Sequence, residues 1–300
     1  MKYLIKVLVK TIIRTIISIF LFPFLLFKYN LVDKEIKYFL RYIKINVVYF
    51  QKFRTLPNLN KPDSFNEYIN RYKFFEIPSA IELSDKLQAK DIVSKFITTL
   101  KTEKVWGKFS FSIFKEKGVY KLNSDSGGVY IRNDVRNFFS ETNMLIRFLI
   151  PYGWWVGEWP YPMIQTKIFK EEFLDELSDI ADYKFFCVNG KVVGCHYIYD
   201  RHKETKTKEL WIDINGCAFE WQIYDSFDVG NSDDWVKPDS WFEMIKKSED
   251  LSKKFEFVRV DLYNTSKGVF FGELTFWPQA GYYKGRDIDK LWGAIKIKLK

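Results

Sequence analysis

Two acidic residues in the last fifth of the chain, Asp261 and Glu273, have the spacing of a carboxylate pair that could hold a divalent cation. Each lies in a strand-like stretch, and a turn centred near Lys267 separates the two stretches. Such a hairpin places Asp261 opposite Glu273, where Cβ atoms lie about 4.5–5.5 Å apart and like charges destabilise the pair. Mg²⁺ would compensate them, because it is a hard cation that takes one or two carboxylates together with phosphate oxygens.

The same hairpin predicts which side chains accompany the two acids. Apolar and polar residues alternate in both stretches, and side chains two apart share a face of a strand. One face is therefore expected to carry Arg259, Asp261, Tyr263, Phe271, Glu273 and Thr275, with Arg259 opposite Thr275. Spacing alone leaves two alternatives open, since both carboxylates could be exposed, or each could pair with Arg259 or a lysine. A register shift of one residue would separate the pair.

The elements that must position these residues form a mixed body of helices and antiparallel strands. A linker at Leu56–Pro62 precedes a helix capped by Asp63 or Ser64, and a second helix is expected over Ser84–Leu100. Residues 118–132 read as strand, small-residue loop and strand. Asn189-Gly190 and Asn215-Gly216 each lie between apolar runs and predict hairpin turns with positive φ. Another helix opens at Pro238-Asp239-Ser240.

The charge of the chain is concentrated at its N-terminus. The whole chain has 47 Lys and Arg and 38 Asp and Glu, a net charge of +9. Residues 1–60 hold 11 of the bases and 2 of the acids, so the remaining 36 bases and 36 acids balance. A nucleic-acid-binding domain would need a basic face on its body, which this distribution argues against. The three cysteines have no C-x-x-C spacing, and Cys195-His196 alone does not predict a zinc site.

Residues 1–60 are expected to form a membrane-associating arm, and residues 61–300 the catalytic domain. Lys6, Lys10 and Arg14 recur every four residues, and an uncharged run from Thr15 to Phe27 follows them. Thirteen residues are too few to cross a bilayer, so we favour an amphipathic helix lying in the plane of an anionic membrane, with residues 1–54 in contact with it. A signal-anchor span and a helix docked on the protein's own core are the alternatives. In the first two cases the body stays on the cytoplasmic face of the bacterial inner membrane.

Several long motifs occur in an order that resembles a known family. They are "EWPY" (158–161), "DYKFFCVNGK" (182–191), "FVRVDLYN" (257–264) and "FGELTFWP" (271–278). They resemble the TupA-like ATP-grasp proteins of teichuronopeptide, capsule and lipopolysaccharide biosynthesis, and the likeness extends from about Pro62 to Gly281. It implies an ATP-grasp fold of the α+β class, in which two subdomains close on ATP. It also implies that Asp261 and Glu273 are the Mg²⁺ ligands and that Arg259 neutralises a phosphate or substrate carboxylate.

The resemblance assigns further residues to ATP and substrate. Lys121 would contact the ATP phosphates, and the loop that covers them would consist of Ser126, Gly127 and Gly128. The segment that binds the adenosine would contain Glu171 and Phe173. Lys184 would face the nucleotide or the substrate. Without the resemblance, Lys121 would be taken for a solvated strand lysine, Ser126–Gly128 for a turn and Glu171 for part of an exposed acidic pair.

The chain departs from the family at the phosphate-covering loop. The family typically reads N-H-G-S-G-G, whereas this chain reads Asn123-Ser124-Asp125-Ser126-Gly127-Gly128. Asp125 brings a negative charge towards the expected phosphates, which is unfavourable unless a metal or a cationic side chain meets it. The stretch between Lys86 and Lys121 is also shorter than in the family.

Three hypotheses about function follow. The first is an ATP-dependent ligase that joins an amino compound to a sugar carboxylate, with a uronic acid as the expected acceptor, through an acyl phosphate. The second is a glycosyltransferase of capsule or lipopolysaccharide synthesis, for which Asp287-Ile288-Asp289 is the one D-x-D motif. The third is a non-catalytic ATP-binding homologue, which the altered loop would favour.

Overall fold

The computed structural model describes residues 34–125, 127–132, 135–149, 156–172, 181–201 and 206–299. Contacts group the chain into two units, Met1–Lys44 and Ile45–Lys300, and the second unit contains both β-sheets. The boundary that we predicted at residues 60 and 61 falls inside the second unit, 16 residues beyond the division at Lys44. Helix α2 (Lys34–Phe53) crosses that division. Among the described residues, no helix is long and apolar enough to cross a membrane.

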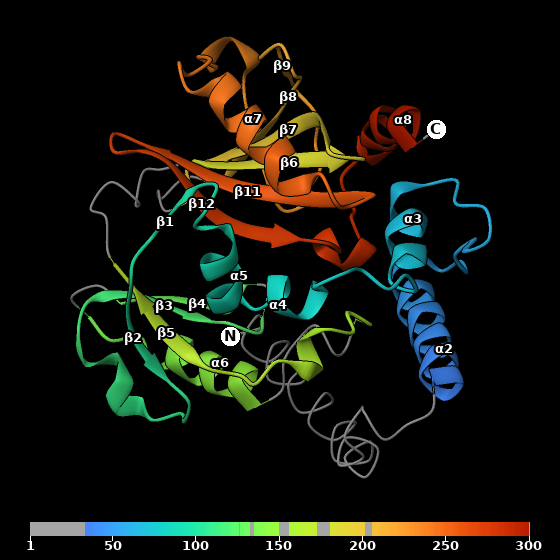
Figure 1. Cartoon of the computed structure of the whole chain (residues 1–300). Coiled ribbons are helices and arrows are strands. Elements are labelled where there is room, and N and C mark those ends of the chain that lie inside the picture. The colour runs from blue at the N-terminus through green and yellow to red at the C-terminus, as the bar shows by residue number, and fades with distance from the viewer. Residues whose placement is uncertain are drawn as a thin grey trace. The chain divides into compact units, whose positions relative to one another are not determined.

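The larger sheet of the second unit has eight strands in the order β1-β12-β11-β6-β7-β8-β10, with β9 also paired to β8 (Figure 1). Antiparallel pairing joins β12, β11, β6, β7 and β8, whereas β1 joins β12 and β10 joins β8 in parallel. The strands are β1 (Thr98–Thr99), β6 (Asp182–Val188), β7 (Lys191–Tyr199), β8 (Lys208–Ile212), β9 (Ala218–Phe219), β10 (Asp228–Val229), β11 (Phe257–Thr265) and β12 (Gly268–Thr275).

The smaller sheet has four strands in the order β2-β5-β3-β4. Its strands are β2 (Thr102–Trp106), β3 (Gly118–Leu122), β4 (Val129–Arg132) and β5 (Ile168–Glu171). Two sheets with helices are the architecture expected of two α+β subdomains, and the expected strand, loop and strand over 118–132 is confirmed by β3 and β4. Short 3₁₀ helices cover Phe111–Lys115 (η2), Tyr161–Met163 (η4), Ser232–Asp234 (η6) and Pro278–Gly281 (η7).

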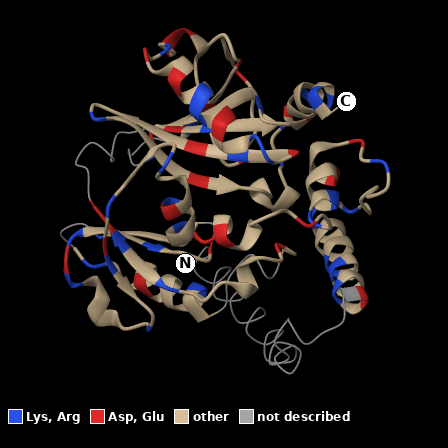
Figure 2. Ribbon diagram, in the orientation of Figure 1, with Lys and Arg blue, Asp and Glu red and all other residues tan. Residues whose placement is uncertain are grey.

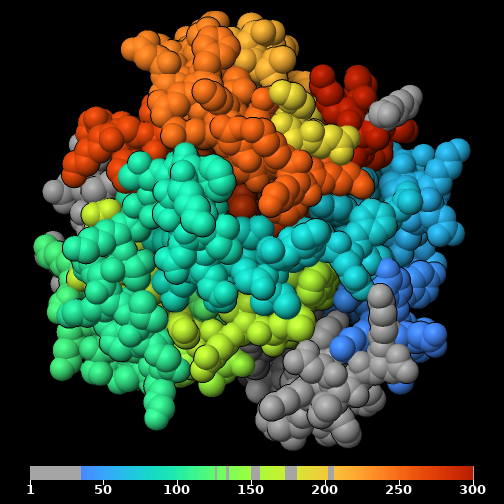
Figure 3. Space-filling model, viewed as in Figure 1, coloured from blue at the N-terminus to red at the C-terminus, as the bar shows by residue number. Residues whose placement is uncertain are grey.

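Helices cover the larger sheet and fill the space beside it. The remaining helices are α3 (Phe65–Tyr72), α4 (Ala80–Ser84), α5 (Lys86–Val93), α6 (Phe138–Leu149), α7 (Trp241–Ser252) and α8 (Ile288–Leu299). Helix α7 packs on β11, β6 and β7 through its buried Trp241 and Met244. Figure 3 shows α4 and α5, in teal, between the orange strands and the green sheet on this face of the unit.

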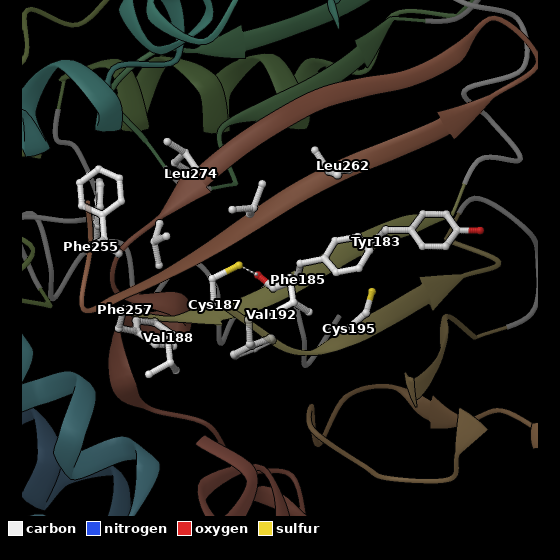
Figure 4. Packing of buried hydrophobic residues seen from close by; sticks show 14 of the residues in the cluster. Tyr183, Phe185, Cys187, Val188, Val192, Cys195, Phe255, Phe257, Leu262 and Leu274 are labelled. Carbon is white, nitrogen blue, oxygen red and sulfur yellow. Dashed lines mark hydrogen bonds between the residues drawn. The ribbon is translucent and has the colours of Figure 1, made fainter. Parts of the chain in front are cut away.

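The hydrophobic core explains why β6 lies in the middle of the larger sheet. All seven residues of β6 are buried, since both its edges are paired and both its faces are covered. Its apolar face contributes Phe185 and Cys187 to a cluster that also contains Leu262 of β11 and Leu274 of β12. Figure 4 shows these side chains gathered together. On the opposite face of the same strands, Lys184, Asp261 and Glu273 line the candidate site.

Most expected local elements form, and two differ. Ser64 caps α3 by accepting a hydrogen bond from the Glu67 amide, and Asn189-Gly190 turns with both φ angles positive, at 49° and 74°. The helix expected over Ser84–Leu100 begins after Asp85 but ends at Val93, because Thr98–Thr99 pairs with β12 instead. At Asn215-Gly216 only the glycine has a positive φ, of 90°. There the Asp213 carboxylate accepts bonds from two backbone amides and shapes a longer turn.

Candidate functional site

A cavity of about 600 Å³ opens between the polar face of the larger sheet and the smaller sheet. Seven of the residues that we predicted for the site line it: Lys121, Gly127, Glu171, Lys184, Arg259, Asp261 and Glu273. Gly128 is described but is not among the lining residues, while Ser126 and Phe173 lie outside the described residues. The structure thus brings together side chains from β3, β5, β6, β11 and β12 that are up to 152 positions apart in the sequence. The roles predicted for them remain predictions.

The predicted pairing of Asp261 with Glu273, and of Arg259 with Thr275, is confirmed. The reason differs from the one we assumed. The turn is centred between Ser266 and Lys267, since Thr265 pairs with Gly268, and a β-bulge restores the pairing beyond Leu262. The face predicted for Phe271 is wrong: Phe271 pairs with Leu262 and lies in the hydrophobic core, on the side away from Glu273.

Gly272 is the extra residue of this bulge. It lies between Phe271 and Glu273, so these two side chains, although two positions apart, face opposite sides of the sheet. A Cβ atom on Gly272 would lie 2.9 Å from the Asp261 backbone oxygen, a distance that real Cβ atoms essentially never show. Glycine at this position therefore permits the close approach of the two strands that aligns the carboxylates. Figure 2 shows the acidic positions on β11 and β12.

Cationic side chains surround the two carboxylates. Arg259 binds Asp261 through two nitrogens, both at 2.7 Å, and Lys184 Nζ lies 2.5 Å from Asp261 Oδ2. Glu273 lies 3.4 Å from Arg259 Nη2 and 3.5 Å from Lys86 Nζ. Burial alone would raise the pKa of Glu273, but the positive charges of Lys86, Lys184 and Arg259 lower it to about 2. Glu273 is therefore ionised at neutral pH.

This arrangement corresponds to one of the alternatives left open by the sequence, in which each acid pairs with Arg259 or a lysine. The number of charges distinguishes this arrangement from a set of ion pairs in which every charge is balanced. Four cations, Lys86, Lys184, Arg201 and Arg259, lie in one connected cluster with Asp182, Asp261 and Glu273, which leaves one positive charge in excess. A low-dielectric cavity with two opposed carboxylates and excess cations is electrostatically complementary to a polyphosphate with a divalent cation.

A second charged cluster lies on the smaller sheet. Glu171 of β5 is only 3% exposed and forms ion pairs with both Lys121 of β3 and Lys90 of α5. Burial lowers the pKa of Lys121, but the Glu171 charge outweighs it and holds that pKa above the usual value. The sequence left two alternatives for these residues, an exposed acidic pair containing Glu171 and a solvated side chain for Lys121. The structure shows neither. Two cations around one acid again leave a positive excess.

Asp125 does not bring an uncompensated charge to the loop. Its buried carboxylate lies 2.6 Å from Arg147 Nη1 of α6, and Lys86 Nζ donates a hydrogen bond to its backbone oxygen. Gly127 has a φ of 89° and lines the cavity, whereas a side chain at Gly128 would collide with Leu122. The unfavourable charge noted in the sequence is therefore neutralised by a residue 22 positions away.

The strand register gives the order of groups along the cavity. Tyr263, Asp261 and Arg259 follow one another on one face of β11, each about 6.5–7 Å from the next. At the Tyr263 end, Tyr263 packs against Phe270 and Leu100, and Lys121 and Glu171 lie close enough to affect its pKa. At the Arg259 end lie Thr275 and then the η7 turn. The two carboxylates are in the middle.

Sequence reasoning missed several lining residues, above all Lys86. Asp85 caps α5 by accepting bonds from the Leu87 and Gln88 amides, which places Lys86 in the first turn and Lys90 one turn later on the same face. The sequence did contain a signal for these lysines, namely an aspartate that can cap a helix followed by two lysines four positions apart. Glu158 of the "EWPY" motif also lines the cavity, and burial raises its pKa to about 8.

Two other motifs have structural roles. Asp287 of the D-x-D sequence accepts a hydrogen bond from the Gln222 amide and forms an ion pair with Lys290, so it anchors the start of α8. His196 lies fully buried with Nε2 2.5 Å from Glu209 Oε2, while Cys195 packs in the core. Within the described part of the chain, no group of three or more His, Cys, Asp or Glu could hold a metal ion.

Comparison with known proteins identifies the family. Residues 67–297 match the family described as TupA-like ATPgrasp, which covers more than half of the chain. The chain belongs to the TupA-like ATP-grasp family, and the expected ATP-grasp fold is confirmed with it. No curated protein matches the sequence.

Solved structures that resemble the chain at low sequence identity include three ligases. The D-alanine–D-alanine ligase of Bacillus anthracis is 16% identical, with a TM-score of 0.39 over 72% of this chain and 67% of that one. The D-alanine–D-alanine ligase of Helicobacter pylori is 13% identical, with a TM-score of 0.41 over 80% and 70%. The L-amino acid ligase of Bacillus licheniformis is 12% identical, with a TM-score of 0.42 over 80% and 55%.

The bulge makes a testable prediction about stability. Gly272→Ala must separate the backbones of β11 and β12, so we expect the free energy of unfolding in urea to fall by about 1–3 kcal/mol. Gly107→Ala is the matched control, because a Cβ there meets no atom within 4 Å, and it should change the free energy by less than about 0.5 kcal/mol. Equal effects of the two substitutions would contradict the close approach at Gly272.

Proposed function

We propose that this protein is an ATP- and Mg²⁺-dependent ligase that joins a carboxylate to an amine. The observation that carries the proposal is the carboxylate pair Asp261 and Glu273, held opposite each other by the bulge and surrounded by an excess of cations. Membership of the TupA-like ATP-grasp family supports it. In such a reaction the γ-phosphoryl group passes to the carboxylate, which gives ADP and an acyl phosphate. The amine then attacks the carbonyl carbon and releases phosphate and a proton.

The residues present fit a nucleotide with its metal. Asp261 and Glu273 would hold Mg²⁺, which when bound neutralises phosphate charge and polarises the transferred group. Lys86, Lys121 and Lys184 would contact phosphate oxygens, and the glycine at Gly127 would let backbone amides approach them. The apolar side chains of Leu100, Val119, Val129 and Ile131 line the cavity near Lys121 and would enclose a base.

Arg259 and Lys184 would then act on the acceptor carboxylate. Both are buried, so their charges are only weakly screened and remain oriented without further cost when a substrate arrives. Arg259 Nη2 reaches Asp261, Glu273 and Thr275, which places a guanidinium at the border between the carboxylate pair and the far end of the cavity. We propose a sugar carboxylate of the uronic-acid type as acceptor and cell-envelope polysaccharide synthesis as the process served.

The two other hypotheses have weaker support. A glycosyltransferase would use a D-x-D motif at its metal, but Asp287 is occupied as an anchor for α8 and does not line the cavity. A non-catalytic homologue was favoured by the altered loop, and Arg147 neutralises the charge of Asp125, which is one of the departures in that loop.

The catalytic proposal is tested by ADP release. The full-length chain is mixed with Mg-ATP and a panel of uronic acids and amino acids, and we expect ADP formation that requires both an acid and an amine. Asp261→Asn should lower the rate at least about 100-fold, because it removes a metal-binding charge at the transferred phosphate. Asp250→Asn, at a surface carboxylate paired with Lys253, is the matched control and should leave the rate unchanged. Turnover of sugar nucleotides without ADP release would instead identify a glycosyltransferase.

We further propose that residues 1–54 bind the cytoplasmic face of an anionic membrane. Residues 1–60 account for the whole net charge of +9. Within Met1–Lys44, the described part of α2 exposes Ile36, Phe39, Leu40 and Ile43, which recur at three- and four-residue intervals on one helical face. The segment with Lys6, Lys10 and Arg14 lies outside the described residues, and its predicted helix stays a prediction. An exposed apolar stripe beside a basic sequence suits a lipid interface.

Vesicle co-sedimentation tests the membrane proposal independently of catalysis. The full-length chain should bind phosphatidylglycerol vesicles and not phosphatidylcholine vesicles, with binding weakened by salt. Changing Lys6, Lys10 and Arg14 to Glu should lower the affinity by about 100-fold. A variant with Lys246, Lys253 and Lys254 changed to Glu carries the same net charge and should bind as the wild type does. Equal loss in both variants would refute a role for the N-terminal segment.

A further inference from the structure

The turn that follows β12 has an unusual backbone. Gln279, Ala280 and Gly281 of η7 are consecutive and all lie in the left-handed region, with φ values of 51°, 52° and 69°. Glycine adopts this conformation freely, whereas a side chain with a Cβ is strained there. Two of the three positions nevertheless carry side chains, and strain of this kind persists only where the surrounding structure imposes it.

Helix α3 imposes it through three buried polar side chains on one of its faces. Asn66, Asn70 and Lys73 lie at intervals of four and three residues and are at most 6% exposed. Asn66 exchanges two hydrogen bonds with the Tyr283 backbone, and Asn70 donates to the Gly281 oxygen at 2.8 Å. The α3 helix packs against η7, and these side chains lie in the contact.

Lys73 is the central residue of this connection. Its fully buried ammonium group donates to the Ala280 oxygen at 2.8 Å and to the Val156 oxygen at 2.6 Å. It also lies 4.6 Å from the centre of the Tyr282 ring. An isolated buried ammonium group would be very unfavourable, so these oxygens are what makes Lys73 tolerable in the interior. Lys73 thereby joins α3, the segment before Glu158 and the η7 turn.

The two strained side chains have different surroundings. The Ala280 methyl group is buried in a cluster with Tyr49, Val156 and Tyr282, and this packing accounts for a side chain at that position. Gln279 is exposed and lines the cavity, and within the described part of the chain its amide has no hydrogen-bond partner. Contacts within the described part of the protein therefore do not explain why a residue other than glycine occupies position 279.

The place of Gln279 in the cavity indicates what it contacts. The register of β11 and β12 puts the η7 turn beyond Arg259 and Thr275, on the side of the carboxylate pair away from Lys121 and Glu171. The nucleotide base is proposed at the Lys121 end, so the η7 end is where the second substrate must lie. A primary amide both donates and accepts hydrogen bonds, as hydroxyl groups require, and Arg259 supplies a charge for a carboxylate.

We infer that Gln279 binds the hydroxyl groups of a hydroxylated carboxylate substrate, and that Lys73 and Asn70 are positioning residues that hold Gln279 in its strained conformation for this contact. The inference rests on the proposed ligase function for the place of the nucleotide. The inference gives Gln279 a role in the affinity for the acceptor, without a contact between Gln279 and ATP. Because glycine would suit the turn better, the sequence retains a less stable residue where its side chain reaches the ligand.

The test compares two substitutions that change the backbone in the same way. Gln279→Gly and Ala280→Gly both remove strain at a φ close to 50°, but only the first removes a cavity amide. Binding of D-glucuronate to the full-length chain is measured by calorimetry with and without saturating Mg-ADP. We expect Gln279→Gly to weaken glucuronate binding at least about tenfold, as the loss of one or two hydrogen bonds does, with Mg-ADP affinity unchanged. Ala280→Gly should bind both ligands as the wild type does.

Asn70→Ala tests the positioning role without removing a buried charge. It deletes the bond to the Gly281 oxygen and the Oδ1 acceptor that Asn70 offers to Lys73, so we expect weaker glucuronate binding at unchanged Mg-ADP affinity. Lys73→Met should have the same effect if it folds. Unaltered glucuronate affinity in Gln279→Gly, equal loss in Ala280→Gly, or a wild type that binds Mg-ADP but no glucuronate would overturn the inference. A wild type that binds glucuronate but no Mg-ADP would refute the proposed function and leave this site standing.

Discussion

The repulsion between a buried and a half-buried carboxylate is the constraint on which the rest of this structure depends. Asp261 and Glu273 face each other across a hairpin, at a separation where like charges are destabilising. This repulsion is offset because Arg259, Lys184 and Lys86 approach the two carboxylates from three different elements. Those elements can converge only if the sheet, α5 and the hairpin pack as they do. Assembling so many charges in the interior costs free energy, and a metal ion bound with a polyphosphate would offset that cost.

The positive excess repeats at a second point in the cavity, where Lys121 and Lys90 share Glu171. Each cluster alone could be a structural ion-pair network. Their common orientation towards one cavity, together with membership of the TupA-like ATP-grasp family, is what distinguishes a binding site from such networks. The η7 turn adds a third feature at the opposite end, where a strained backbone is held by buried polar groups of α3.

The sequence predicted the fold class, the hairpin pairing and seven of the residues that line the cavity, and its errors have definable causes. Alternation and turn residues are local signals, so β11, β12 and the Asn189-Gly190 turn could be read directly. The bulge at Gly272 could not, because it depends on how closely two strands approach, and its omission put Phe271 on the wrong face. The error in the predicted turn centre compensated for the omitted bulge, so the pairing of Asp261 with Glu273 was still predicted correctly. The neutralisation of Asp125 by Arg147 likewise depends on the tertiary packing of α6.

The central claim is that the two carboxylates hold a divalent cation together with a nucleotide. Electron paramagnetic resonance of Mn²⁺, used in place of Mg²⁺, measures this directly, since free and bound Mn²⁺ give different signals. The full-length chain should bind Mn²⁺ at least about tenfold more tightly when ADP is present, and Glu273→Gln should abolish that gain without preventing folding. Mn²⁺ binding that is indifferent to ADP, or unchanged in Glu273→Gln, would contradict the account.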